Sequence, residues 1–355
     1  MNKEIICTLG PISSVPDVLL EMGRAGMSVL RINCSHYEPK TAVPIIAFVR
    51  KHHPQVRILV DLQGPRLRVA SRFPEKSARE GQIVQFVGEV NFISARRKDA
   101  FVIPLSLSRP FGDFENATTV HMKDGTMVFD VIENRAKDGY VLAKTRWGGV
   151  VRGEKAINVP GLPLPASALT DKDRVDLRFA AEVNADAVML SFVNRAADIQ
   201  ELVGAWEKLK PARKPAVWAK IETSEGIKQV PAICQVTDAI LIGRGDLAAE
   251  VGFLEAPAAQ SQLIEAARKA SKPCYIATQV LESMRANPYP ARSEMRDIYV
   301  SLREGATGFM LTAETSVGKY PIPAIEILRD MIRRHATETS PPASGKVRKA
   351  KSPAK

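Results

Sequence analysis

The chain has 355 residues, of which 45% are hydrophobic and 25% charged, and this composition suits a globular protein with one large and one small domain. It shows no apolar run long enough for a membrane span, no signal-peptide pattern, and four widely spaced cysteines that indicate neither a zinc site nor a disulfide framework. The formal charge of +11 includes five cations within residues 346–355, and with 6% aromatics and no nucleic-acid-binding motif we expect a cytoplasmic protein without nucleic-acid or membrane partners.

Short apolar and β-branched runs recur along the chain, each followed by a segment of helical period. This is the pattern of βαβ units with parallel strands. Eight such runs predict an α/β protein with a closed (β/α)8 barrel, the TIM barrel, rather than an open doubly wound sheet. The predicted strands are residues 4–9, 28–33, 57–62, 186–192, 216–222, 238–243, 273–278 and 308–312.

Residues 69–155 break this spacing. Their stretches alternate between apolar and polar residues and contain Asp-Gly turns at 124–125 and 138–139, which predicts a small antiparallel β domain inserted into the barrel. The residues after 336 are rich in Pro, Ser, Ala and Lys without apolar period, so we expect disorder there. The predicted parts are a barrel of residues 1–68 and 156–336, a hinged lid of residues 69–155 and a basic tail of residues 337–355.

Polar side chains gather at the ends of the predicted strands. TIM barrels build their active sites at the C-terminal ends of strands, so polar residues there are functional candidates. A single polar residue at a strand end can be explained as a solvated side chain without function. Polar residues at seven strand ends in register favour a functional site. The candidates are Arg31, Asn33, Ser35, His36, Asp61, Ser191, Lys220, Glu222, Arg244, Gly245, Asp246, Thr278, Thr312 and Glu314.

Glu222 and Asp246 follow adjacent predicted strands, so their carboxylates are expected to converge on one ion. A site with a small number of hard oxygen donors suits Mg²⁺, because this ion takes its other ligands from water and substrate. Lys220 lies two residues before Glu222 and shares its face of the strand, which would place a cation beside a phosphoryl group in transfer. The structural alternative is a pair of salt bridges, with Lys220 and Arg244 as the cations. Gly245 would let the backbone approach an anion closely.

A set of motifs runs along the predicted barrel in a fixed order. They are TLGPISS, LRINCSH, VDLQGPRLR, ALTDKDRVDLRFA, SFVNRAADI, AKIETSEGI, LIGRGDLAAEVG, IATQVLESM and MLTAETSVGKYP. With these motifs the chain resembles the pyruvate kinase family over residues 1–68 and 156–335, and the insertion lies where that family carries a mobile lid. The resemblance implies glycolytic phosphoryl transfer from phosphoenolpyruvate to ADP, giving pyruvate and ATP, with Mg²⁺ or Mn²⁺ as cofactor.

The resemblance also implies roles for individual residues. Lys220 would stabilise the transferring phosphoryl group, Arg31 would contact the phosphate, and Thr278 would lie near the carbon that is protonated. The remaining implied roles are Ser191, Gly245, Asp246 and Thr278 for substrate binding, Glu222 and Asp246 for Mg²⁺, Asn33, Ser35, Asp61 and Leu62 for a monovalent cation, and Asn33, His36, Arg68 and Lys155 for the nucleotide.

Several positions depart from the family pattern. The family's TKGPE is Leu62 to Arg66 here, and because a guanidinium can replace a bound K⁺ electrostatically, we expect K⁺ to be dispensable. Thr312 stands where the family has serine, and the lid pattern around Asp124 and Lys155 is only loosely kept. The chain stops where the family continues with a further domain, so we expect no control by sugar-phosphate effectors and leave homo-oligomer formation open.

Two other functions remain open from the sequence alone. A metal-dependent pyruvate or oxaloacetate lyase would hold the same enolate on such a barrel, but it would have no use for Arg68, Lys155 and a nucleotide lid. A catalytically inactive relative could serve as a binding protein, although it would have no reason to keep Lys220, Glu222 and Asp246 together.

Overall fold

The computed structural model describes residues 3–35, 37–89, 100–106, 111–123, 125–162 and 165–339. His36 and Asp124, which the sequence analysis named, therefore lie outside the described residues, as do residues 340–355 of the predicted tail. The last helix runs to Thr339, three residues past the predicted end of the barrel at 336.

Within the described residues, eight parallel strands close into a barrel, and all eight predicted strands are confirmed. The strands pair in the order β1-β17-β16-β15-β14-β13-β3-β2, so neighbours along the chain are neighbours in the barrel except at the insertion, where β3 pairs directly with β13. The strands are β1 (Glu4–Thr8), β2 (Val29–Asn33), β3 (Arg57–Leu62), β13 (Ala187–Leu190), β14 (Ala216–Ile221), β15 (Ala239–Gly243), β16 (Cys274–Ala277) and β17 (Gly308–Leu311).

Helices surround this barrel and bury their apolar faces against the outward side chains of its strands. Their ends follow local chemistry: α3 begins at a capping box in which Thr170 and Asp173 bond each other's backbone N–H, and α8 ends at Gly305 with a φ of 117°. The helices are α1 (Pro16–Ala25), α2 (Pro39–His52), α3 (Asp171–Glu182), α4 (Ala196–Lys208), α5 (Ser224–Val236), α6 (Arg244–Val251), α7 (Ala256–Lys269), η4 (Glu282–Arg285), α8 (Arg292–Glu304), α9 (Ala313–Ser316) and α10 (Pro321–Thr339).

The inside of the barrel is filled by apolar side chains from every strand. They are Ile6, Val29, Leu59, Met189, Trp218, Leu241, Tyr275 and Met310. Side chains two residues apart on a strand share a face, so the next inward positions toward the C-terminal ends form a second layer above this core. That second layer consists of the polar residues Thr8, Arg31, Asp61, Ser191, Lys220 and Thr312, with Gly243 and Ala277 on the two remaining strands. The apolar layer thus closes the bottom of the barrel, and the polar layer faces its mouth.

The insertion forms a second, smaller closed barrel with its own apolar core. Its described strand pairs are antiparallel except that β6 and β7 pair in parallel, which the alternation pattern did not indicate. The strands that enter and leave it, β4 and β12, pair with each other, so the domain reaches slightly beyond residues 69–155 on both sides. Its elements are β4 (Leu67–Val69), β5 (Lys76–Ala78), β6 (Ile83–Gly88), β7 (Phe101–Ser106), η2 (Phe111–Asn116), β8 (Thr119–Met122), β9 (Met127–Arg135), η3 (Ala136–Asp138), β10 (Tyr140–Trp147), β11 (Gly149–Val151) and β12 (Ala156–Asn158).

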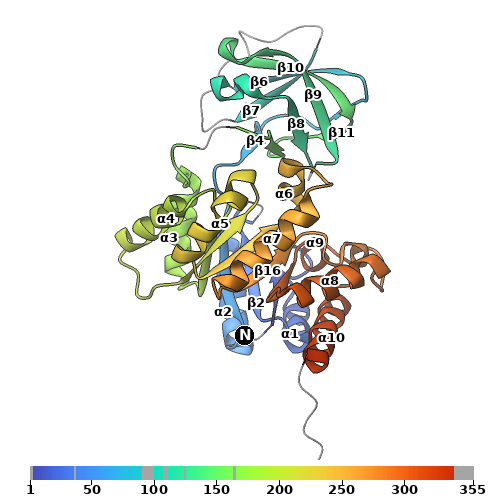
Figure 1. Ribbon diagram of the computed structural model, residues 1–355. Coiled ribbons are helices and arrows are strands. Elements are labelled where there is room, and N and C mark those ends of the chain that lie inside the picture. Colours follow the sequence, from blue (N-terminus) through green and yellow to red (C-terminus); the bar gives the residue numbers. More distant parts are fainter. Residues whose placement is uncertain are drawn as a thin grey trace, which may run out of the picture.

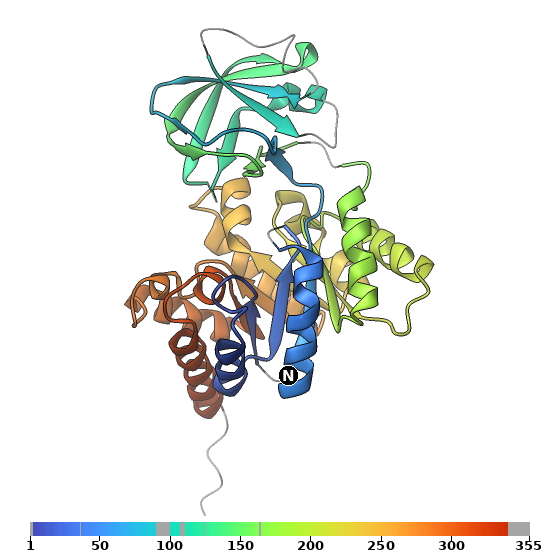
Figure 2. The ribbon, with the colours of Figure 1, turned by 180° about the vertical axis from the view of Figure 1, so that it is seen from behind.

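The small barrel lies over one end of the large barrel, with α6 beneath it (Figures 1 and 2). One contact between them is that of the His121 imidazole on β8 with the backbone carbonyl of Ala249 on α6. The insertion therefore covers the mouth of the barrel, as a lid would. In the described part of the chain, every helix is too short or too polar to cross a lipid bilayer.

Candidate active site

A cavity of about 680 Å³ lies between the mouth of the large barrel and the lid. It is lined by polar side chains that the sequence analysis selected, together with cations from the lid. The barrel contributes Arg31, Asn33, Ser35, Arg66, Ser191, Lys220, Glu222, Asp246, Thr278 and Thr312, and the insertion contributes Arg68, Lys123, Arg152, Glu154 and Lys155.

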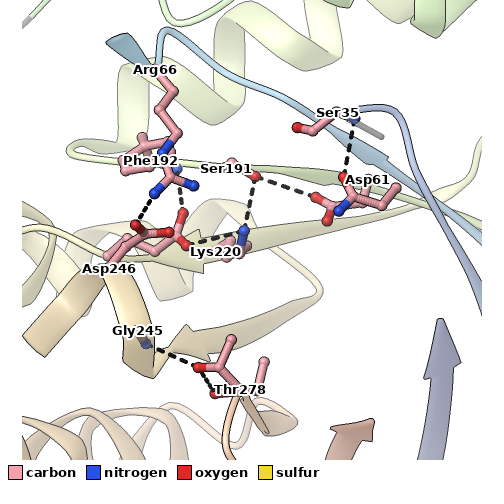
Figure 3. A network of polar contacts seen from close by, with 12 residues as sticks. Ser35, Asp61, Arg66, Ser191, Phe192, Lys220, Gly245, Asp246 and Thr278 are labelled. Atoms are coloured by element: carbon pink, nitrogen blue, oxygen red, sulfur yellow. Dashed lines mark hydrogen bonds and ion pairs between the residues drawn. The ribbon is translucent and has the colours of Figure 1, made fainter. Parts of the chain in front are cut away.

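Lys220 (Figure 3) forms an ion pair with Glu222, with 3.0 Å between Nζ and Oε1, and both side chains line the cavity. Lys220 Nζ also donates to Ser191 Oγ over 3.3 Å. Burial lowers the pKa of Lys220, but the carboxylates of Glu222 and Asp61 outweigh it and raise that pKa above its ordinary value. The ammonium group therefore stays charged at the floor of the cavity.

The carboxylates of Glu222 and Asp246 lie next to each other, as their positions on adjacent strands predicted. Burial raises the pKa of Glu222 against the opposing charge of Lys220, and the neighbouring Asp246 adds to the rise. Gly243 makes this arrangement possible, since a Cβ there would lie 2.4 Å from Glu222 Oε1.

This pair of carboxylates fits a divalent ion. Among the described residues, no three His, Cys, Asp or Glu side chains gather where they could hold a metal by themselves. Two buried carboxylates that repel each other and face a cavity are the donor set of an Mg²⁺ that takes its other ligands from water and substrate. Of the salt bridges considered as the alternative, the one between Lys220 and Glu222 is present, whereas Arg244 pairs with Asp297.

The residues predicted for a monovalent cation are held by other contacts. Asp61 accepts from Arg31 Nε over 2.8 Å and from Ser191 Oγ over 3.3 Å, and Asn33 Oδ1 accepts the Ser35 N–H over 3.1 Å. Asp61 and Leu62 are almost fully buried and do not line the cavity. Arg66, expected to replace the cation, is ion-paired with Asp246 instead.

Thr278 has a left-handed backbone that sets its position at the cavity. Its φ is 67° and that of Gln279 is 53°, which is unfavourable for a β-branched residue. Arg244 donates to the carbonyl oxygens of both residues, each over 2.7 Å from Nη2. The Gly245 N–H donates to Thr278 Oγ1 over 2.9 Å. The N–H group that was predicted to bind the substrate anion is therefore bonded to Thr278, which was predicted to bind the same substrate.

Glu314 has no exposed surface and bonds to Thr312, which lines the cavity. Its Oε2 accepts the Thr312 N–H over 2.7 Å and its Oε1 accepts the Leu281 N–H over 3.0 Å. The carboxylate thereby joins the loop after β17 to the loop after β16.

The lid side of the cavity is cationic. Arg68 donates to the Glu154 carbonyl over 2.8 Å, while its Nε is buried and has no hydrogen-bond acceptor among the described residues. Sequence reasoning selected Arg68 and Lys155 but missed Lys123 and Arg152. Lys123 precedes the Asp-Gly turn, so a hairpin tip was predictable there, but no local pattern shows which tip faces the barrel.

A parallel barrel with acidic and basic side chains at its mouth, covered by a cationic lid, defines an α/β-barrel enzyme for an anionic substrate. The family model described as pyruvate kinase, barrel domain, matches residues 1–325. The chain belongs to the pyruvate kinase family and so to the phosphotransferases.

Curated relatives agree with this assignment. Proteins named pyruvate kinase from Agrobacterium vitis, Thermotoga maritima and Corynebacterium efficiens are 33%, 32% and 34% identical to the chain over 94%, 92% and 95% of its length. The matches cover 68%, 69% and 70% of those relatives, and 57% of the one from Geobacillus stearothermophilus. The chain thus spans about two thirds of the first relatives and less of others.

Proposed function

We propose that this protein transfers the phosphoryl group of phosphoenolpyruvate to ADP at the cavity between barrel and lid, using a divalent ion, Mg²⁺ or Mn²⁺. The observation that carries the proposal is the ion pair of Lys220 with Glu222, 3.0 Å long, beside Asp246 and below the lid cations. This arrangement offers a cation, two hard oxygen ligands and an anion-binding cover within one cavity.

The residues of the chain divide the work between the two ends of phosphoenolpyruvate. Lys220 would neutralise the charge on the phosphoryl group in transfer, and Arg31 would bind the phosphate from the same layer of the barrel. Thr278, Gly245 and Ser191 would hold the enolate end of the substrate, with Thr278 close to the carbon that takes up a proton.

A divalent ion held by Glu222 and Asp246 would supply Lewis-acid stabilisation of the enolate. Arg68 and Lys155 from the lid side, with Asn33 and His36 from the barrel, would bind the nucleotide. Closure of the lid excludes water, which strengthens each of these charge interactions.

K⁺ is dispensable in this proposal, because the Arg31 guanidinium already lies beside Asp61, one of the residues implied for the monovalent cation. Turnover in buffer whose only monovalent cation is tetramethylammonium tests this point. No turnover there, with activity restored by K⁺, would contradict it.

The main test is a coupled assay in which lactate dehydrogenase reports pyruvate formed from phosphoenolpyruvate, ADP and Mg²⁺. Lys220→Met should lower kcat by at least about 10²-fold, the usual effect of losing a charge that stabilises a transition state. Phosphoenolpyruvate binding, measured by calorimetry, should persist. Lys208→Met, at an exposed position on α4, is the matched control and should leave kcat unchanged.

The assay also separates the alternatives. Pyruvate release from oxaloacetate in the absence of ADP would point to a lyase, and phosphoenolpyruvate binding without any pyruvate formation would point to a binding protein. Equal kcat in Lys220→Met and the wild type would refute the role of the ammonium group.

A further inference from the structure

Arg66 reaches from the hinge of the lid down onto Asp246. It is the second residue after Gly64 in the segment that links β3 to β4, and its guanidinium points at the Asp246 carboxylate in Figure 3. Its Nη2 donates to Asp246 Oδ1 and, over 3.2 Å, to Asn158 Oδ1 on β12. The guanidinium also lies 5.2 Å from the centre of the Phe192 ring. Arg66 therefore ties one predicted metal ligand to Asn158 on β12, the strand by which the chain leaves the lid.

The carboxylates of Glu222 and Asp246, which line the cavity, and of Asp61, which contacts Arg31 and Ser191 of its lining, each have a cation of their own. Arg31 pairs with Asp61, Lys220 with Glu222, and Arg66 with Asp246. These groups balance one another, so the cavity without ligands has little need of a further cation. A divalent ion at Asp246 would have to displace the guanidinium or lie against it, and like charges at contact distance repel strongly in a buried site.

Arg66 also has an unused donor. Its Nε is buried and has no acceptor within the described part of the chain, and this side chain lines the same cavity as Lys220 and Thr278. A buried donor without a partner costs free energy that an anionic ligand would recover. An anion in the cavity thus offers Arg66 a new hydrogen-bond acceptor, and Asp246 would then be free to bind the divalent ion.

We propose that Arg66 makes the divalent-ion site conditional on the anionic substrate: the guanidinium occupies Asp246 while the cavity is empty and moves to the substrate anion when it arrives. This inference rests on the proposed function and assigns to Arg66 a role in coupling the two ligands. Because such coupling is reciprocal, the metal strengthens anion binding by the same factor as the anion strengthens metal binding. The contact with Asn158 extends the same exchange to the lid hinge.

The test measures Mn²⁺ binding directly, by electron paramagnetic resonance of the free ion, with ADP absent so that no turnover occurs. For wild type, phosphoenolpyruvate should tighten Mn²⁺ binding by about 5-fold to 150-fold, the usual range of such coupling. Arg66→Met keeps the aliphatic contact with Phe192 and should bind Mn²⁺ at least about tenfold more tightly without phosphoenolpyruvate, since a charge-assisted contact no longer competes. The coupling factor should shrink accordingly. Arg66→Gln serves as a second neutral variant, and thermal melting checks that each is folded.

Arg68→Met is the matched control. Arg68 feels the charge of Asp246 but its hydrogen bond goes to Glu154, so its removal tests the general field of the cavity without a direct contact. Mn²⁺ binding that Arg66→Met and Arg66→Gln leave unchanged, or that Arg68→Met tightens equally, would overturn this inference alone. No Mn²⁺ binding to wild type or any variant, with or without phosphoenolpyruvate, would overturn the proposed function and the inference with it.

Discussion

Glu314→Gln changes the charge of one fully buried side chain and almost nothing of its shape. Both carboxylate oxygens of Glu314 accept backbone N–H groups, Oε1 from Leu281 and Oε2 from Thr312, and Oε2 also accepts the Thr312 hydroxyl. A glutamine amide has one acceptor oxygen and one NH2 group. In either orientation it therefore sets an N–H donor against a buried backbone N–H donor.

The cost of this substitution follows from those contacts. One buried N–H loses its acceptor, at about 1–3 kcal/mol, and the bond that remains is weakened from a charged to a neutral one, by about 1 kcal/mol. We expect the free energy of unfolding to fall by about 2–4 kcal/mol. At about 2 °C or more per kcal/mol for a domain of this size, Tm should drop by at least about 4 °C.

Thermal melting followed by circular dichroism measures the drop, with Glu282→Gln as the control. Glu282 lies on η4 in the neighbouring segment, but its ion pair with Arg285 is exposed, so its loss should cost less than about 1 kcal/mol. Equal values of Tm for the two variants would refute the reasoning, because the buried carboxylate of Glu314 would then stabilise the fold no more than an exposed one.

Two further predictions concern the metal site and a buried carboxyl group on α6. Gly243→Ala should weaken Mn²⁺ binding more than about tenfold, because the new Cβ would displace the Glu222 carboxylate. The control is Gly204→Ala, which has open space around it on α4 and should raise stability by about 0.5–1 kcal/mol while leaving Mn²⁺ binding unchanged. Equal Mn²⁺ affinity in both variants would contradict this prediction. Burial raises the pKa of Glu250 despite hydrogen bonds from Ser224 and Gly161, so the folded protein keeps a proton that the unfolded chain loses above about pH 4.5. The stability that this bound proton contributes is fully present below that pH and is lost as the pH rises through the pKa of Glu250 in the folded protein. Urea titrations at increasing pH should therefore show the wild type losing stability relative to Glu250→Gln. A stability difference between the two that does not vary with pH would exclude this.

Much of the barrel was predictable because strand positions and inward faces depend on neighbours a few residues away. The alternation of β14 already places Trp218, Lys220 and Glu222 on one face, and the structure brings the last two within 3.0 Å. The carboxyl-end rule then selects the polar layer at the mouth without any knowledge of the partners. The convergence of Glu222 and Asp246 followed from the order of adjacent strands.

The pairings across the cavity depend on contacts that no local pattern contains. Arg66 and Asp246 are separated by 180 positions, and the sequence placed Arg66 at a monovalent-cation site rather than on a predicted metal ligand. The same holds for the parallel pairing of β6 with β7 and for the lid cations Lys123 and Arg152. Periodicity in the sequence indicates which face of an element is buried. The pairing of one charged side chain with another is decided only when the loops close and the lid packs on the barrel. The free energy of that packing is shared among residues far apart in the chain.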